Sequence, residues 1–169
     1  MTTLIALLRA VNVGGTGKLP MAELRTLCTK AGFRDVRTYI QSGNVVLSSA
    51  ASVPTAKATL EKLLERKLGK PGRVMVRTAD ELEAVVARNP FPEAAPNQLT
   101  IVFLDDAPPK GALKDWKIPG RERLALHGRE LFLHFPDGMG NSRLKVPFAD
   151  VGTGRNLNTV RKLIEMARA

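Results

Sequence analysis

The sequence contains few residues able to form covalent or metal cross-links. Among its 169 residues there is one cysteine, Cys28, so no disulfide can form within the chain. Two histidines, His127 and His134, together with this cysteine are too few for a zinc cluster. We therefore expect no metal site, and a single cysteine is typical of a protein from a reducing compartment.

Long apolar runs are missing as well. No run approaches the roughly 18 apolar residues that a membrane-spanning helix requires. Residues 1–9 have neither a preceding basic region nor a cleavage-site pattern, so they predict a strand and not a signal peptide. We expect a soluble, cytoplasmic protein that does not associate with a membrane.

Aromatic residues are scarce, with 6 Phe, 1 Trp and 1 Tyr. RNA-binding sheets stack bases on aromatic side chains of their central strands. The first predicted strand and residues 44–48 contain none, so that platform is absent. The G-x-S-x-G nucleophile motif of α/β-hydrolases is absent too.

Charge, in contrast, is abundant and uneven. Residues 1–78 contain 13 Lys and Arg against 4 Asp and Glu, a net charge of +9, whereas residues 79–169 contain 13 against 12, a net charge of +1. A basic half raises the local concentration of anions such as nucleic acid, nucleotides or phosphorylated partners. A solvated basic surface without a ligand is the alternative interpretation.

The hydrophobic pattern of the first half predicts alternating strands and helices. The expected elements are a strand at 3–13, a helix at 20–31, a hairpin of strands 35–41 and 44–49, a helix at 54–68 and a strand at 73–78. This β-α-β-β-α-β order is the ferredoxin-like pattern. Both alternate sets of residues in the first strand are apolar, so both sheet faces need a cover.

The second half predicts a further set of mixed elements. They are a helix at 79–88, a strand at 98–104, a weak helix at 110–116, strands near 122–127 and 130–135, a polar Gly-rich segment at 136–156 and a closing helix at 157–167. The predicted class is therefore α+β. We expect a ferredoxin-like subdomain, residues 1–78, packed against a second, smaller α+β subdomain, residues 79–169.

Two features near the first strand are candidates for anion binding. The turn containing Asn12, Gly14, Gly15 and Lys18 offers backbone N–H groups and a lysine before a helix. It is not a P-loop, because a leucine and not Ser or Thr follows Lys18, and a flexible connection is the alternative. Arg9 is a charge inside an apolar strand and must reach a carboxylate, a ligand or solvent.

Two more Gly-rich segments lie in the second half. In the first, Ser142, Arg143 and Lys145 can hold a phosphate or carboxylate. The second, residues 152–159, opens the closing helix, where Thr153 or Asn156 can alternatively serve only as an N-cap.

Four stretches of the sequence resemble one bacterial family, domain of unknown function 1697. They are residues 7–15, 20–24, 38–46 and 155–160. The resemblance implies two α+β subdomains and carries no assigned activity. The polar motif positions of the family map onto Arg9, Asn12, Ser42, Asn44, Ser142, Arg155, Asn156 and Asn158. These side chains suit holding a ligand better than acid–base chemistry, or alternatively cap turns and tie the subdomains together.

Three hypotheses on function follow. The first is a binding protein for an anionic, phosphate-bearing ligand, either a nucleotide or a nucleic acid, held between the subdomains. Its candidate ligand-binding residues are Arg9, Asn12, Gly14, Gly15, Lys18, Ser42, Asn44, Ser142, Arg143, Arg155, Asn156 and Asn158. The second is an enzyme acting on a small phosphorylated or carboxylated metabolite, with carboxylates from Asp105, Asp106, Asp137 and Asp150. The third is a structural or protein-interaction role.

The closing helix carries one geometric prediction. Leu157, Val160 and Ile164 should face inward, and the amino end should bring Arg155 and Asn156 near the turn 14–18 or 42–44, where an anion could bind. The sequence leaves the catalytic residues, the cofactor and the oligomeric state open.

Overall fold

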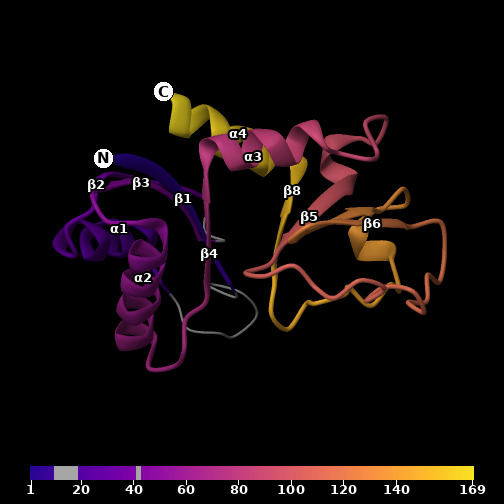
Figure 1. The fold of residues 1–169 in the computed structure, drawn as a ribbon, viewed down its shortest axis with the longest axis horizontal. Helices are drawn as coiled ribbons and strands as arrows, with labels where there is room; N and C mark the ends of the chain where they lie inside the picture. Colours follow the sequence, from indigo (N-terminus) through magenta and orange to yellow (C-terminus); the bar gives the residue numbers. More distant parts are fainter. Residues whose placement is uncertain (10–18, 41–42) are drawn as a thin grey trace. The chain divides into compact units, whose positions relative to one another are not determined.

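The computed structural model describes residues 1–9, 19–40 and 43–169. The chain divides into two compact units, one of Met1–Glu83 with Leu163–Ala169 and one of Ala84–Lys162. The strands are β1 (Thr2–Leu8), β2 (Arg34–Tyr39), β3 (Asn44–Ser49), β4 (Val74–Thr78), β5 (Leu99–Phe103), β6 (Arg123–His127), β7 (Glu130–His134) and β8 (Thr153–Asn156). The helices are α1 (Met21–Lys30), α2 (Val53–Leu68), α3 (Ala79–Ala87) and α4 (Leu157–Arg168), with short 3₁₀ turns at Pro96–Gln98 and Met139–Asn141 (Figure 1).

The predicted α+β class is confirmed. Each unit contains a four-stranded antiparallel sheet, in the order β2-β3-β1-β4 in the first unit and β6-β7-β5-β8 in the second. In the first sheet β1 is central and pairs with β3 through Ile5↔Val46 and with β4 through Ala6↔Val76. The doubly apolar sequence of β1 fits this central position, because a central strand is buried on both faces.

Helices α1 and α2 lie on the same side of the first sheet (Figure 1). Ser52 begins α2 by accepting a hydrogen bond from the backbone N–H of Thr55 at 3.4 Å, and Gly69, with φ +72°, ends it. Their buried residues form one core with the sheet: Leu4, Ala6, Leu8, Leu24, Cys28, Leu60 and Leu64. Burial raises the pKa of the Cys28 thiol to about 12, so this cysteine stays protonated at neutral pH.

The opposite face of the first sheet is buried too. Ile5 and Leu7, the alternate residues of β1, are 0% and 1% exposed. The carboxyl end of α4 belongs to the same unit, and Arg37 of β2 donates a hydrogen bond to the carbonyl of Met166 at 2.6 Å. The expectation that both faces of β1 are covered therefore holds.

The sequence did not predict strand β8. Residues 153–156 lie in the segment expected to be polar loop, yet they pair with β5 through Phe103↔Thr153 and Thr100↔Asn156. Strand β8 is the edge strand of the second sheet. Because an edge strand needs no apolar residues on both faces, its sequence carries little hydrophobic alternation.

Helix α4 follows β8 directly. Asn156 caps its start, since the side-chain carbonyl accepts the backbone N–H of Thr159 at 2.9 Å. The predicted inward face is present: Leu157 and Val160 are buried and Ile164 is half-buried, with the fully buried Leu163 beside them.

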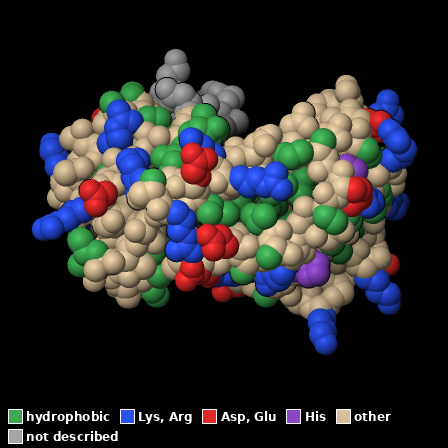
Figure 2. Space-filling view, turned by 90° about the horizontal axis from the view of Figure 1, so that it is seen from above, with side chains coloured by type: hydrophobic (Ala, Val, Ile, Leu, Met, Phe, Trp, Pro, Cys, Tyr) green, Lys and Arg blue, Asp and Glu red, His purple; other side chains and the backbone are tan. Residues whose placement is uncertain are grey.

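Basic and acidic side chains are mixed over part of the surface, as Figure 2 shows for one face. In the first unit, for example, the Arg168 guanidinium pairs with both Asp80 and Glu83, the latter at 2.9 Å. The net charge of +10 is therefore not spread evenly. The cations that form no ion pair are the candidates for binding an anionic ligand. Among the described helices, none combines the length and the hydropathy needed to cross a membrane.

Arg123 of β6 organises a polar cluster beside strand β7. Its guanidinium pairs with Glu93, donates to Nδ1 of His134 at 3.1 Å and stacks over the Phe91 ring at 4.3 Å from the ring centre. Burial and this guanidinium lower the pKa of His134 below its ordinary 6.5. The folded protein therefore holds His134 neutral, with Nδ1 as the acceptor.

The stability of the protein should consequently fall as the pH drops through about 6.5. Below this pH His134 becomes protonated in the unfolded chain, whereas in the folded chain it stays neutral to a lower pH. Protonation therefore favours the unfolded state and lowers the free energy of unfolding by at most about 1.4 kcal/mol per pH unit for one group. The free energy of unfolding, measured with urea at several pH values, should depend less steeply on pH in His134→Gln than in the wild type. The exposed His127 supplies the control: His127→Gln should keep the wild-type slope. Equal slopes in all three proteins would contradict the assignment.

Candidate anion-binding site

Two long loops run along the second sheet and meet. The first, residues 104–122, joins β5 to β6, and the second, residues 135–152, joins β7 to β8. Because Arg123 pairs with His134 in the register of β6 and β7, the end of the first loop lies beside the start of the second. The sheet register therefore brings together residues that are 15 or more positions apart in the sequence.

Three side-chain interactions fasten these loops to each other. The Nε1–H of Trp116 donates to the carbonyl of Lys145 at 2.8 Å. Arg121 pairs with Asp137, with Nε 3.2 Å from Oδ2. The hydroxyl of Ser142 donates to Glu122 at 2.6 Å.

Trp116 ends a series of tight turns. The backbone N–H groups of Ala112, Lys114 and Trp116 each donate to the carbonyl three residues earlier, at 3.0–3.2 Å. Gly111 takes a positive φ of +79°. The weak helix predicted for residues 110–116 is therefore wrong, because a left-handed glycine so close to Pro109 breaks helical geometry and leaves separate turns.

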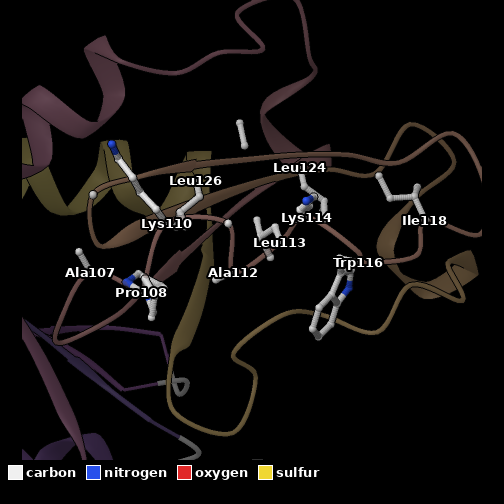
Figure 3. Close-up of a pocket in the computed structure, with 14 residues that line it drawn as sticks. Ala107, Pro108, Lys110, Ala112, Leu113, Lys114, Trp116, Ile118, Leu124 and Leu126 are labelled. Atoms are coloured by element: carbon white, nitrogen blue, oxygen red, sulfur yellow. The ribbon is translucent and has the colours of Figure 1, made fainter.

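The Trp116 side chain lines two adjoining pockets, which we call together the Trp116 site. The first, about 610 Å³, is shown in Figure 3 with Leu113, Leu124 and Leu126 on its wall and Lys110 and Lys114 among its lining residues. These three leucines also pack against the buried core of the second sheet. The indole itself is 36% exposed, an unusual position for a large aromatic ring.

The second pocket of the Trp116 site is smaller and more charged. It measures about 430 Å³ and is lined by Asp115, Trp116, Lys117, Pro119, Arg143 and Lys145. Three of these six residues are cationic and one is acidic. Arg143 and Lys145 belong to the second loop. The hydrogen bond from Trp116 to the Lys145 carbonyl therefore also fixes the backbone beside these cations.

The cations around Trp116 have no acidic partners among the residues that the structure describes. Within the part of the chain that the structure describes, no ion pair involves Lys110, Lys114, Lys117, Arg143 or Lys145. All five are exposed, so each alone attracts an anion only weakly in water. A ligand that contacts several of these cations and the indole at once would bind much more tightly.

The sequence matches one protein family over most of its length. A family model described as "Protein of unknown function (DUF1697)" matches residues 1–132. The chain belongs to this family. The resemblance inferred from the four sequence motifs is thus confirmed. No curated protein matches the sequence.

A solved structure is similar to this DUF1697 protein over nearly its full length. It is that of the conserved bacterial protein SP0830 from Streptococcus pneumoniae, with 24% sequence identity, 98% of each chain covered and a TM-score of 0.82. A likeness at this level of identity shows the fold, and it agrees with the α+β architecture described above.

One of the candidate binding residues, Arg143, lies at the Trp116 site, and a second, Ser142, precedes it in the sequence. Arg143 lines its charged pocket directly. The hydroxyl of Ser142 is engaged within the protein, since it donates to Glu122 and accepts the backbone N–H of Leu144 at 3.1 Å. The hydrogen bond from Ser142 lowers the pKa of Glu122, so this carboxylate stays ionised and keeps the tie between the loops.

Three more candidates lie on β8 and α4 of this family member. Arg155 is 8% exposed, and its guanidinium donates to the Thr153 hydroxyl at 2.7 Å and to the Gly154 carbonyl at 2.9 Å. Burial lowers the pKa of Arg155 to about 10. Asn156, the cap of α4, lines another pocket of about 410 Å³, and Asn158 is exposed on the helix.

The remaining candidates belong to the first unit. Asn44 is fully buried and its side-chain amide donates to the carbonyl of Tyr39 at 3.0 Å, which fixes the hairpin between β2 and β3. Arg9 is half-buried just after β1. The other five, Asn12, Gly14, Gly15, Lys18 and Ser42, lie outside the described residues, as does the turn 14–18 expected near Arg155 and Asn156; of the alternative turn, 42–44, only residues 43 and 44 are described.

The sequence did not lead us to predict Trp116, or three of the lysines that line the Trp116 site, as binding residues. The signal was available, because the only tryptophan of the chain stands in the polar stretch Lys114-Asp115-Trp116-Lys117. A large aromatic residue among charges, outside any apolar pattern, indicates a surface position. No grouping of three or more His, Cys, Asp and Glu side chains fit to hold a metal ion occurs in the residues described.

Proposed function

We propose that this DUF1697 protein binds an anionic, phosphate-bearing ligand, a nucleotide or a single-stranded nucleic acid, at the Trp116 site. One observation carries the proposal: an exposed indole, held by the Lys145 carbonyl, stands among five cations that have no acidic partner among the described residues. Bases stack on an indole regardless of sequence, and lysine and arginine attract phosphates. The leucine-lined wall gives a base or sugar an apolar surface.

The proposal includes the subdomain organisation expected from the sequence. A ferredoxin-like arrangement of residues 1–78 is supported by the strand order β2-β3-β1-β4 and by the element order β-α-β-β-α-β. A boundary between residues 78 and 79 is supported by the end of β4 and the start of α3 at that point, although the compact units divide after Glu83 and the first also contains Leu163–Ala169. Among the predicted binding residues, Arg143 has the most direct support, because it lines the charged pocket.

The decisive experiment uses the protein's own fluorescence. Trp116 is the only tryptophan, so any change in tryptophan emission reports on this site. Titration at low salt with nucleoside mono- and triphosphates and with a single-stranded oligonucleotide should quench the emission in a saturable way. Quenching by oligonucleotide alone would identify nucleic acid as the ligand. Absence of binding by every member of this panel would refute the proposal.

Salt dependence should show which cations take part. Each phosphate contact to a single strand contributes about −0.7 to the slope of log affinity against log salt concentration. We therefore expect Arg143→Ala and Lys145→Ala each to make the slope about 0.7 less steep. Lys70→Ala, a charge change on an exposed residue that lines neither pocket of the Trp116 site, should leave the slope unchanged.

A further inference from the structure

A second cationic hollow lies in the first unit, between α1 and α2. This α1–α2 groove measures about 500 Å³ and is lined by Leu27, Lys30, Ala31, Thr59, Lys62, Leu63, Arg66 and Lys67. The spacing explains why they share a surface. Positions 27 and 30 of α1 with its C-cap at 31, and positions 59, 62, 63, 66 and 67 of α2, follow the i, i+3, i+4 repeat of one helix face.

The floor of the groove is aliphatic. Leu27 and Leu63 are half-buried, and both pack on the core from its outer side. The faces turned to the sheet are different ones, marked by the buried residues Leu24 of α1 and Leu60 and Leu64 of α2. The helices therefore leave part of their apolar surface open to solvent between them.

The rim of the groove is cationic. Lys67 pairs with Glu23 of α1 and so links the two helices. In the described portion of the chain, Lys30, Lys62 and Arg66 take part in no ion pair. None of the described residues that line the groove is acidic. Much of the excess positive charge of the first half thus gathers around one apolar floor.

We propose that the α1–α2 groove binds an acidic segment of a partner protein that carries large aliphatic side chains. Leucine-sized side chains would cover Leu27 and Leu63, while the carboxylates of the segment would meet Lys30, Lys62 and Arg66. Charge complementarity selects an acidic partner. The lining selects a peptide over nucleic acid, because none of the described residues that line the groove is aromatic, so a base finds no ring to stack on, and a phosphate backbone gains nothing from an apolar floor.

The test uses a fluorescein-labelled helical peptide built from leucine, glutamate and alanine, followed by fluorescence anisotropy with the full chain. Wild-type protein should bind it, and the double variant Lys62→Glu with Arg66→Glu should bind about tenfold more weakly, because two attractions become repulsions. A peptide with serine in place of every leucine should also bind about tenfold more weakly, because it cannot cover the groove floor.

A matched variant controls for net charge. Lys70→Glu with Arg73→Glu changes the charge by the same amount on exposed residues outside the groove, and it should bind the peptide like wild type. Two results would overturn the proposal: equal affinity for the leucine and serine peptides, or the same loss of peptide affinity in both double variants. Either would show that the peptide binds to a diffuse basic surface and not to the groove. Binding of duplex DNA that the groove variant alone loses, without peptide binding, would assign the groove to nucleic acid instead.

Discussion

Replacing Trp116 by alanine should weaken the binding of a labelled single-stranded oligonucleotide by roughly tenfold to a hundredfold. Stacking of one base on an aromatic side chain contributes about 1–3 kcal/mol, and alanine offers no ring. Because the variant has no tryptophan emission, anisotropy of the labelled oligonucleotide is the measurement. The fold should survive, since the indole is 36% exposed and its N–H bonds only to a loop carbonyl.

The variant Trp116→Phe separates stacking from the fastening of the loops. Phenylalanine keeps a ring but cannot donate to the Lys145 carbonyl. We expect it to retain most of the affinity if stacking dominates, and to bind as weakly as Trp116→Ala if the hydrogen bond to the second loop positions the site. Wild-type affinity in Trp116→Ala would show that the ligand does not contact the indole, and the proposed function would then lose its main support.

Replacing Gly152 by alanine should destabilise the protein by about 1–3 kcal/mol. A Cβ atom at this position would lie 2.6 Å from Cγ1 of Val102, 2.9 Å from Cδ2 of Leu104 and 3.1 Å from the backbone carbonyl of Phe103. Val102 is stiff because it is β-branched, and the backbone of β5 cannot move without disturbing the sheet. Strand β8 would therefore be pushed away from β5.

Chemical denaturation of Gly152→Ala and of a matched variant, Gly140→Ala, would measure this effect. A Cβ at Gly140 would meet no atom within 4 Å, and its φ is not in the left-handed range, so alanine there should be neutral or slightly stabilising. The same loop thus provides a clash and its control. Equal stabilities of the two variants would show that the contact between Gly152 and β5 is looser than the distances indicate.

Local hydrophobic periodicity was enough to predict most elements of this protein. The strand predicted at 44–49 is β3, Asn44–Ser49, and the helix predicted at 54–68 is α2, Val53–Leu68. These elements bury one or both faces, so their sequences repeat every two or every 3.6 residues. Strand β8 was not predicted, because it lies at the edge of its sheet and is held by backbone pairing. Backbone pairing does not require particular side chains, so the sequence shows no pattern there.

The sequence by itself determined the α+β class, the family and the concentration of positive charge in the first half, because composition and periodicity are properties of neighbouring residues. Only the tertiary structure decided which cations share a surface. Trp116 and Lys145 meet because the register of β6 and β7 lays two loops side by side, and Lys30 and Lys62 meet because α1 and α2 pack on one sheet. Both sites join residues distant in sequence, and such contacts follow from strand register and helix packing, which no local pattern encodes.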